Sequence, residues 1–512
     1  MIIEGFCLVF VIVFSISIIH RRTFPVNWIT DGDNLDQRAP IADAMQRYSD
    51  DRALAFHTPG HKQGLGAHQL LKKLITDEGL RQEVSLMDEL DDLHDPRGII
   101  KDAQHLAAQL WHADHAIFFV NGTTSAVQTM IMSTVGEGDT ILVPRNAHRC
   151  VTNALILSGA KPVFLSPELD HDFDIALNIS ISTVEHAVEK FPDARALVIT
   201  SPNYYGVPAD LKSIADIVHR HGMLLLVDEA HGAHLQFSDR LPISAMDAGA
   251  DMSAQSTHKL LGSLTQTSML MINSARIERV RRVSSMLQST SPNYLLLASL
   301  DIARLQMQSE GATLIEQTID RSQRLREGIR SVNGLRLFEM PSLDPTKVTV
   351  DMRGLGLTGL EAEQILRHRL KIQCELSDPN NVLFLITCAD TQQTVDRLFE
   401  ALKMLTKFRK AAGERTIIHR STAPPIIEPI ITPRQAFYSS TLTVGLRESI
   451  GRISAEEVTF YPPGIPLICP GELLTVEHVD EIEERLSMGM RVVGAADRSL
   501  RTLKITFPHP PM

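Results

Sequence analysis

The sequence predicts an α/β fold in which a large domain with a mostly parallel sheet is followed by a smaller α+β domain and a C-terminal domain. Two observations carry this prediction. Over residues 116–274, short apolar runs alternate with helical stretches, a pattern typical of buried parallel strands joined by helices. Beyond residue 289 the pattern changes to one long helical stretch followed by shorter strands.

The chain opens with a hydrophobic leader, residues 1–22. Fifteen apolar or small residues, 5–19, are followed by His20, Arg21 and Arg22. A membrane-spanning helix needs about 20 residues, so the leader is either a membrane anchor, an extension from a misplaced start codon or a targeting segment. Arginines after an inserted helix would leave the main body on the cytoplasmic side. We therefore expect a cytoplasmic protein, tethered to a membrane only if the leader is real.

The rest of the chain divides into four expected parts. Residues 23–115 form an N-terminal helical segment that contains the amphipathic stretch 40–51. Residues 116–290 form the large domain. Residues 291–412 form the smaller α+β domain with a long helix over 294–332, and residues 413–512 form the C-terminal domain behind a proline-rich connector. The expected strands of the large domain are residues 116–120, 140–143, 162–165, 196–200, 223–227, 252–256 and 267–272.

Bulk composition makes several classes of protein less favoured. The net charge of −11 argues against a nucleic-acid partner, because such proteins usually carry a basic face. The five cysteines lie far apart without a C-x-x-C pair, which argues against a disulfide framework or a zinc site and indicates a reducing compartment. No metal site is expected at His57 and His61 either, because Pro59 and Gly60 break the helix that such a pair would need.

The stretch Asp228-Glu229-Ala230-His231 ends an apolar run and also spells the acidic box of some helicases. A nucleotide-driven motor needs a Gly-Lys pair to hold its phosphates, and this chain contains none. The strand-end Asp228 therefore requires a different cationic partner.

Polar residues follow several expected strands, where open α/β sheets bind their ligands. Thr123 and Thr124 begin a helix after a glycine and predict either a phosphate cradle or an ordinary helix cap. His148 could stack on a flat ligand or cap a helix, and Tyr205 could bind a ligand or shape a turn. Lys259 sits in a small polar turn at the strand end after that of Asp228.

These residues together fit one cofactor. Pyridoxal 5′-phosphate (PLP) needs a lysine for its aldehyde, an acid facing its ring nitrogen and a cup for its phosphate. Lys259, Asp228 and the turn at Thr123 and Thr124 supply all three. A desolvated lysine at such a position has a lowered pKa and acts as a Schiff-base amine.

The sequence resembles the ornithine/lysine/arginine decarboxylase family of fold-type-I PLP enzymes, whose large domain is like that of aspartate aminotransferase. The resemblance covers residues 36–503. The shorter form of the chain, without a receiver-like N-terminal domain, resembles the arginine decarboxylases of Gram-positive bacteria and related cyanobacterial proteins. It rests on the stretches FHTPGHKQG, DELDDLHDPRGIIKDAQ, FFVNGTTSAVQ, VPRNAHRC, SPNYYGV, VDEAHGAH, QSTHKLLGSLTQ, QSTSPNYLLLASLDIAR and GRISAEEVTFYPPGIPLICPGE.

The resemblance implies a role for each residue. Lys259 bonds to the cofactor, Asp228 keeps its ring nitrogen protonated, Ala230 lies against one face of the ring and His148 stacks on the other. His231 is expected near the ring oxygen or the substrate carboxylate. The residues expected to hold the phosphate are Thr123, Thr124, Ser256 and His258.

The implied reaction is α-decarboxylation of a basic amino acid for polyamine metabolism, by a homodimer or larger homo-oligomer. Arginine is the first choice of substrate, followed by lysine and ornithine. Either Lys259 or a histidine would protonate the α-carbon. The acids considered for the substrate's distal cation are Asp88, Glu89, Asp91, Asp92, Asp95, Glu456, Glu457 and Glu472. The alternatives are an aminotransferase or aldolase, which would carry an arginine clamp, and a catalytically weak binding protein.

Overall fold

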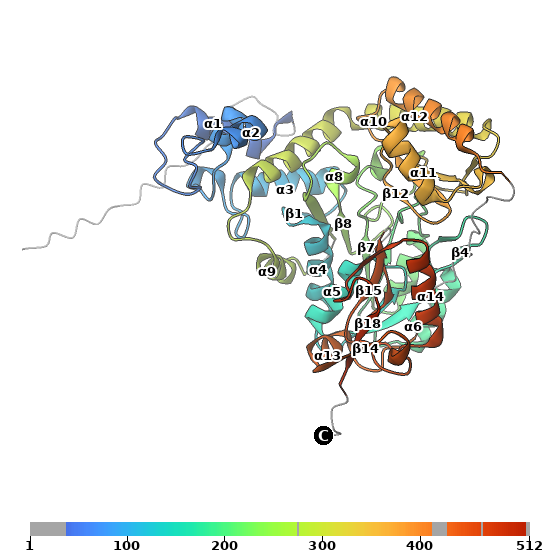
Figure 1. Cartoon of the computed structure of the whole chain (residues 1–512). Coiled ribbons are helices and arrows are strands. Elements are labelled where there is room, and N and C mark those ends of the chain that lie inside the picture. Colours follow the sequence, from blue (N-terminus) through green and yellow to red (C-terminus); the bar gives the residue numbers. More distant parts are fainter. Residues whose placement is uncertain (1–36, 274–275, 412–426, 462–463, 508–512) are drawn as a thin grey trace, which may run out of the picture.

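The computed structural model describes residues 37–273, 276–411, 427–461 and 464–507 (Figure 1). Its centre is a seven-stranded sheet in the order β1-β9-β8-β7-β6-β2-β3. In this sheet β9 runs antiparallel to both of its neighbours, whereas the other paired strands are parallel. The mostly parallel sheet is therefore confirmed. The strands are β1 (His115–Phe119), β2 (Thr140–Pro144), β3 (Lys161–Leu165), β6 (Ala196–Thr200), β7 (Leu224–Asp228), β8 (Met252–Gln255) and β9 (Ser268–Ile272).

Helices cover both faces of this sheet, which explains why its strands are apolar throughout. Alternate residues of β2 face opposite sides: Ile141 and Val143 pack in one core cluster, and Leu142 packs in another. The first cluster contains residues of α4 (Gly122–Thr134) and α5 (Arg149–Ser158), whereas the second contains residues of α6 (Ile181–Lys190) and α7 (Leu211–Arg220).

The N-terminal helices pack against the first part of the long helix α10 (Tyr294–Arg330) (Figure 1). They are α1 (Pro40–Asp50) and α3 (Ile99–Leu110), whereas α2 (Gln69–Gln82) packs against α1. The backbone N–H of Ile41 at the start of α1 donates to the Asp301 carboxylate at 2.9 Å. Helix α9 (Ile277–Leu287) packs against α4.

The far end of α10 carries a second, four-stranded sheet in the order β10-β11-β13-β12. All its paired strands are antiparallel. Figure 1 shows its covering helices at the upper right. Its elements are β10 (Arg336–Leu337), β11 (Lys347–Asp351), α11 (Gly359–Ile365), β12 (Leu376–Ser377), β13 (Asn381–Leu385) and α12 (Gln392–Leu405).

The C-terminal elements lie beside the large sheet and are anchored to it by one buried arginine. Arg145, directly after β2, donates to two backbone carbonyls of β16 (Ile465–Ile468) at 2.7 and 2.8 Å and pairs with Glu472 at 3.1 Å. Both side chains are almost fully buried. The other C-terminal elements are α13 (Pro433–Tyr438), β14 (Thr441–Gly445), β15 (Val458–Tyr461), α14 (Val476–Ser487), β17 (Arg491–Val493) and β18 (Thr502–Thr506).

The expected strands of the large sheet agree with the structure to within about one residue at either end, which is within the usual spread of such boundaries. The leader 1–22, most of the proline-rich connector, and Pro462 and Pro463 lie outside the described residues. Within the part of the chain that is described, no helix is long and apolar enough to cross a membrane. The domain boundaries, the cytoplasmic location and the membrane tether stay predictions.

Candidate active site

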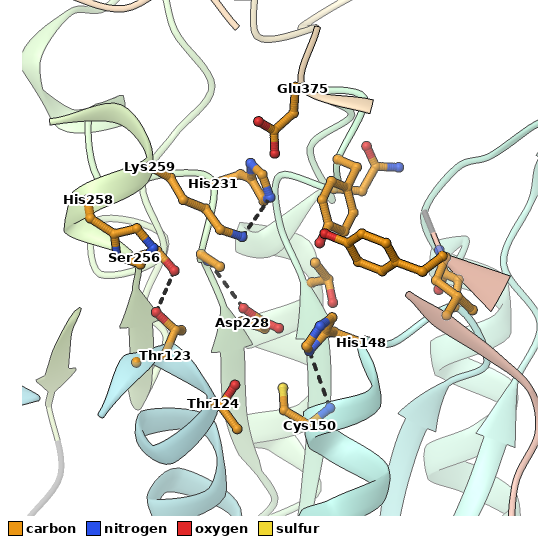
Figure 2. Close-up of a pocket in the computed structure, with 18 of the residues that line it drawn as sticks. Thr123, Thr124, His148, Cys150, Asp228, His231, Ser256, His258, Lys259 and Glu375 are labelled. Atoms are coloured by element: carbon orange, nitrogen blue, oxygen red, sulfur yellow. Dashed lines mark hydrogen bonds between the residues drawn. The ribbon is translucent and has the colours of Figure 1, made fainter. Parts of the chain in front are cut away.

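A cavity of about 450 Å³ opens at the carboxyl ends of the parallel strands (Figure 2). Most of its lining comes from the ends of β1, β2, β6, β7 and β8 and the segments that follow them, the edge at which open α/β sheets bind ligands. All nine residues expected at the site line this one cavity: Thr123, Thr124, His148, Asp228, Ala230, His231, Ser256, His258 and Lys259.

Lys259 lies in the single-turn helix α8 (Thr257–Leu260) and points toward His231 (Figure 2). Its Nζ is 3.0 Å from Nε2 of His231 and 5.4 Å from the ring centre of Tyr204. Burial lowers the pKa of Lys259, while Asp228 opposes this shift. Burial and the neighbouring Lys259 also hold the pKa of His231 well below its usual value. A neutral His231 can therefore accept a hydrogen bond from Lys259.

Asp228 is the last residue of β7 and is 3% exposed. Its Oδ1 accepts a hydrogen bond from the backbone N–H of Ala230 at 3.2 Å. Burial raises the pKa of Asp228, because a carboxylate loses solvation there, while the nearby Lys259 opposes this shift. Among the described residues, none forms an ion pair with this carboxylate, so Asp228 lacks the cationic partner that its burial calls for.

Hydroxyl groups gather at the start of α4. Thr123 Oγ1 lies 2.5 Å from Ser256 Oγ and 2.9 Å from Ser268 Oγ. Gly122 has φ +78°, and a Cβ on it would meet nothing within 4 Å. His258 is held by its Nδ1, which lies 2.7 Å from the carbonyl oxygen of Thr267. The N-terminus of a 13-residue helix with hydroxyls beside it is suited to an anion such as a phosphate.

The structure shows one of the two roles that the sequence left open for His148, the helix cap. It is the N-cap of α5, where its Nδ1 accepts a hydrogen bond from the N–H of Cys150 at 3.3 Å. Its ring also lines the cavity. Burial, with Lys259 and Arg149 nearby, lowers the pKa of His148 to about 4. The imidazole is therefore neutral near pH 7, as suits a ring that stacks on a flat ligand.

Tyr205 acts mainly as a structural residue. Its hydroxyl donates to Asp378 at 2.8 Å, and its backbone N–H donates to the side chain of Asn203. The preceding Tyr204 turns its ring toward His231, with ring centres 4.6 Å apart. Sequence reasoning assigned no role to Tyr204, although it lies in the same strand-end stretch.

None of the eight acids considered for the distal cation of the substrate lines this cavity. Asp91 accepts three backbone N–H groups at the start of α3, and Glu472 is bound to Arg145. The acid that does line the cavity beyond the strand ends is Glu375, directly before β12. Figure 2 shows it across the cavity from Thr123 and Thr124. Sequence reasoning missed it because only the packing of the second sheet brings it here.

Two family models cover most of the chain. The major domain of the Orn/Lys/Arg decarboxylases matches residues 39–341, and their C-terminal domain matches residues 417–487. The arginine decarboxylase of Bacillus subtilis is 41% identical over 479 residues, covering 91% of this chain and 97% of its own length. That of Bacillus anthracis is also 41% identical, covering 92% and 98%.

The chain belongs to the ornithine/lysine/arginine decarboxylase family. Among solved structures, the lysine decarboxylase LdcF of Francisella novicida superposes with a TM-score of 0.81 at 24% identity, covering 92% of this chain and 82% of its own. This likeness shows the fold-type-I architecture, with its large α/β domain. Enzymes of this family use PLP.

The side chains of this decarboxylase fit PLP. Asp228 is a buried carboxylate that forms no ion pair among the described residues, and a protonated ring nitrogen would supply a partner. Lys259 offers an amine whose lowered pKa favours the neutral, nucleophilic form. The open space beside Gly122 and the hydroxyls of Thr123 and Ser256 suit the phosphate. The three features line the same cavity, as one cofactor requires.

Proposed function

We propose that this PLP-dependent decarboxylase removes the α-carboxyl group of arginine as CO₂ and produces agmatine. Lysine and ornithine are the second and third choices of substrate, giving cadaverine and putrescine. The observation that carries the proposal is the convergence of Lys259, Asp228 and the Thr123 cradle on one cavity. The choice of arginine is supported by the names of the relatives that are 41% identical over most of this chain.

Each side chain has a defined part. PLP, when bound, supplies an electron sink for the bond that breaks. Lys259 would bond to the cofactor, and before that bond forms His231 would accept a hydrogen bond from its amine. Asp228 would keep the ring nitrogen protonated, and a charge already in place at that atom costs no reorganisation during the reaction. Ala230 and His148 would hold the two faces of the ring, while Thr123, Thr124, Ser256 and His258 would bind the phosphate.

Glu375 would recognise the far end of the substrate. It lines the cavity on the side away from Thr123 and Thr124 (Figure 2). A carboxylate at this position can form a bidentate pair with a guanidinium group or a single ion pair with an ammonium group. The cavity also presents Tyr204 and Tyr461, whose rings can lie along the aliphatic part of a basic amino acid.

The described lining of the cavity lacks the arginine that the alternative reactions would need. An aminotransferase or aldolase acting on a dicarboxylic substrate would hold the second carboxylate with an arginine. Among the described residues that line the cavity, none is an arginine. A protein that only binds its ligand would not need a desolvated Lys259 facing a neutral His231.

Replacing Lys259 tests the assignment of the cofactor site. Lys259→Ala should lose both turnover and the visible absorbance that depends on a lysine-bound cofactor. Asp228→Asn should retain some cofactor but lose about 100-fold or more in kcat, because one preorganised charge is removed. Absorption spectra and CO₂ release measure both effects. Lys212→Ala, at an exposed position of α7, is the control. A normal cofactor spectrum in Lys259→Ala would refute the assignment.

Replacing Glu375 tests substrate recognition. Glu375→Gln should raise KM for arginine by about tenfold or more, since a hydrogen-bonded charge pair contributes roughly 1.5–3 kcal/mol. The absorbance of the bound cofactor should stay unchanged. Glu400→Gln, on the exposed surface of α12, serves as the control. An unaltered KM for arginine in Glu375→Gln would exclude this role.

We also propose a homodimer or larger homo-oligomer, which the family resemblance implies. An apolar surface supports it: Leu54, Phe56, Leu65 and Leu74 are 79–92% exposed in the single chain. Monomeric proteins rarely leave several large apolar side chains of one segment in water.

Sedimentation of the full chain tests the assembly. The wild-type protein should sediment as a dimer or larger species, and the double variant Phe56→Asp/Leu65→Asp should shift toward the monomer, because charges at these positions oppose burial. A wild-type monomer at micromolar concentration would contradict the proposal.

A further inference from the structure

A fully buried lysine of the second sheet lies behind the Lys259–His231 pair. Lys347, the first residue of β11, has no exposed side-chain surface, and its Nζ forms an ion pair with Asp344 at 2.7 Å. The same Nζ donates to the backbone carbonyl of His231 at 3.4 Å. A cation from the second sheet thus contacts the residue that binds the amine of Lys259.

The ion pair is part of a larger buried network. Asp344 also lies 3.1 Å from Nε2 of His234, and its other oxygen accepts the hydroxyl and the backbone N–H of Thr346 at 2.7 and 2.9 Å. Although burial opposes ionisation, Lys347 and His234 hold the pKa of Asp344 well below its usual range. The network therefore keeps a charged pair next to the turn that carries Ala230 and His231.

The position of Lys347 is tightly fixed. A Cβ on Gly206 would lie 2.8 Å from Cγ of Lys347. Gly206 also has φ +86°, a conformation that favours glycine. The loop after β6 therefore leaves space for the stem of Lys347 and keeps its ammonium group directed at Asp344 and the His231 carbonyl.

We propose that Lys347 is a positioning residue for the reactive lysine: anchored by Asp344, its ammonium group holds the His231 carbonyl and places a buried positive charge behind the Lys259–His231 pair. Two consequences follow. The hydrogen bond fixes the turn so that Nε2 of His231 faces Lys259. The charge opposes protonation of both groups, which keeps His231 an acceptor and leaves the amine of Lys259 neutral more often. The importance of these consequences for turnover rests on the proposed function.

The charged groups around the Lys259–His231 pair support this role of Lys347. The groups around His231 are Lys259 of α8, Tyr204 after β6, His148 at the N-cap of α5, Lys347 of β11 and Asp344 in the loop before β11. After burial and Lys259, Lys347 lowers the pKa of His231 more than Asp344 raises it. The groups that act on the pKa of Lys259 besides burial are Asp228, Glu375 and Cys150, which raise it, and Lys347, which lowers it.

Competitive acylation tests the proposal on the full chain freed of PLP. Acetic anhydride reacts only with the neutral amine, so labelling of Lys259 as a function of pH, read by peptide mass spectrometry, reports its pKa without any turnover. In Lys347→Met, the midpoint should move to higher pH by about one unit, because a nearby cation is lost and the Asp344 anion stays. The double variant Lys347→Met/Asp344→Asn should move the Lys259 midpoint in the same direction, but by a smaller amount than Lys347→Met does.

The double variant guards against a trivial loss of folding, since it leaves no unpaired buried charge. A matched control is Asp301→Asn/Arg304→Met, which removes another fully buried i,i+3 ion pair, at the contact between α1 and α10. It should lower the melting temperature without moving the Lys259 midpoint. An unchanged midpoint in the folded double variant would overturn the proposal.

The PLP-loaded variants add a second measurement. In Lys347→Met/Asp344→Asn, the acid limb of the pH profile of kcat should move to higher pH, since His231 becomes protonated more easily. A profile shape identical to that of the wild type would contradict the proposal. If the wild-type protein decarboxylates none of the three amino acids, the acylation result still decides the role of Lys347, so the two failures are distinguishable.

Discussion

Ionisable groups are buried together at the carboxyl edge of the large sheet, and the chemistry of the cavity depends on this burial. Asp228 and His231 are almost fully buried, and Lys259 faces them from the next strand end. Burial favours the neutral form of each group. A neutral lysine amine is a nucleophile, and a neutral histidine can accept a hydrogen bond from it. A buried carboxylate that forms no ion pair among the described residues favours a ligand that brings a cation. These are the requirements of PLP.

The large sheet does not complete the cavity alone. Arg145 and Glu472 anchor the C-terminal elements, which add Tyr461 and Ile465 to the lining. The second sheet contributes Glu375, and its Lys347 lies behind His231. The segments that set the shape and charge of the cavity are therefore distant in sequence from those that would bind the cofactor, so substrate choice can vary while the cofactor site stays the same.

The sequence predicted the parts of the site that depend on local patterns. Thr123, His148, Asp228 and Lys259 each follow an apolar run, and strand ends in a parallel sheet meet at one edge. The contributions of Glu375 and Lys347 could not be predicted in this way, because they depend on how the second sheet packs on the first. The eight acids considered for the substrate were chosen without knowledge of that packing. Of these, Asp91 accepts backbone N–H groups at the start of α3. Glu472 pairs with Arg145 and so anchors the C-terminal elements.

The proposed reaction is decarboxylation of a basic amino acid in this cavity. The most direct measurement uses the chain without residues 1–22, supplied with PLP, and follows CO₂ release from arginine, lysine and ornithine in parallel while identifying the amine product. The account predicts release from arginine, with agmatine as the product. Absence of release from all three, in a protein that shows the absorbance of a bound cofactor, would contradict it and indicate an aminotransferase or aldolase.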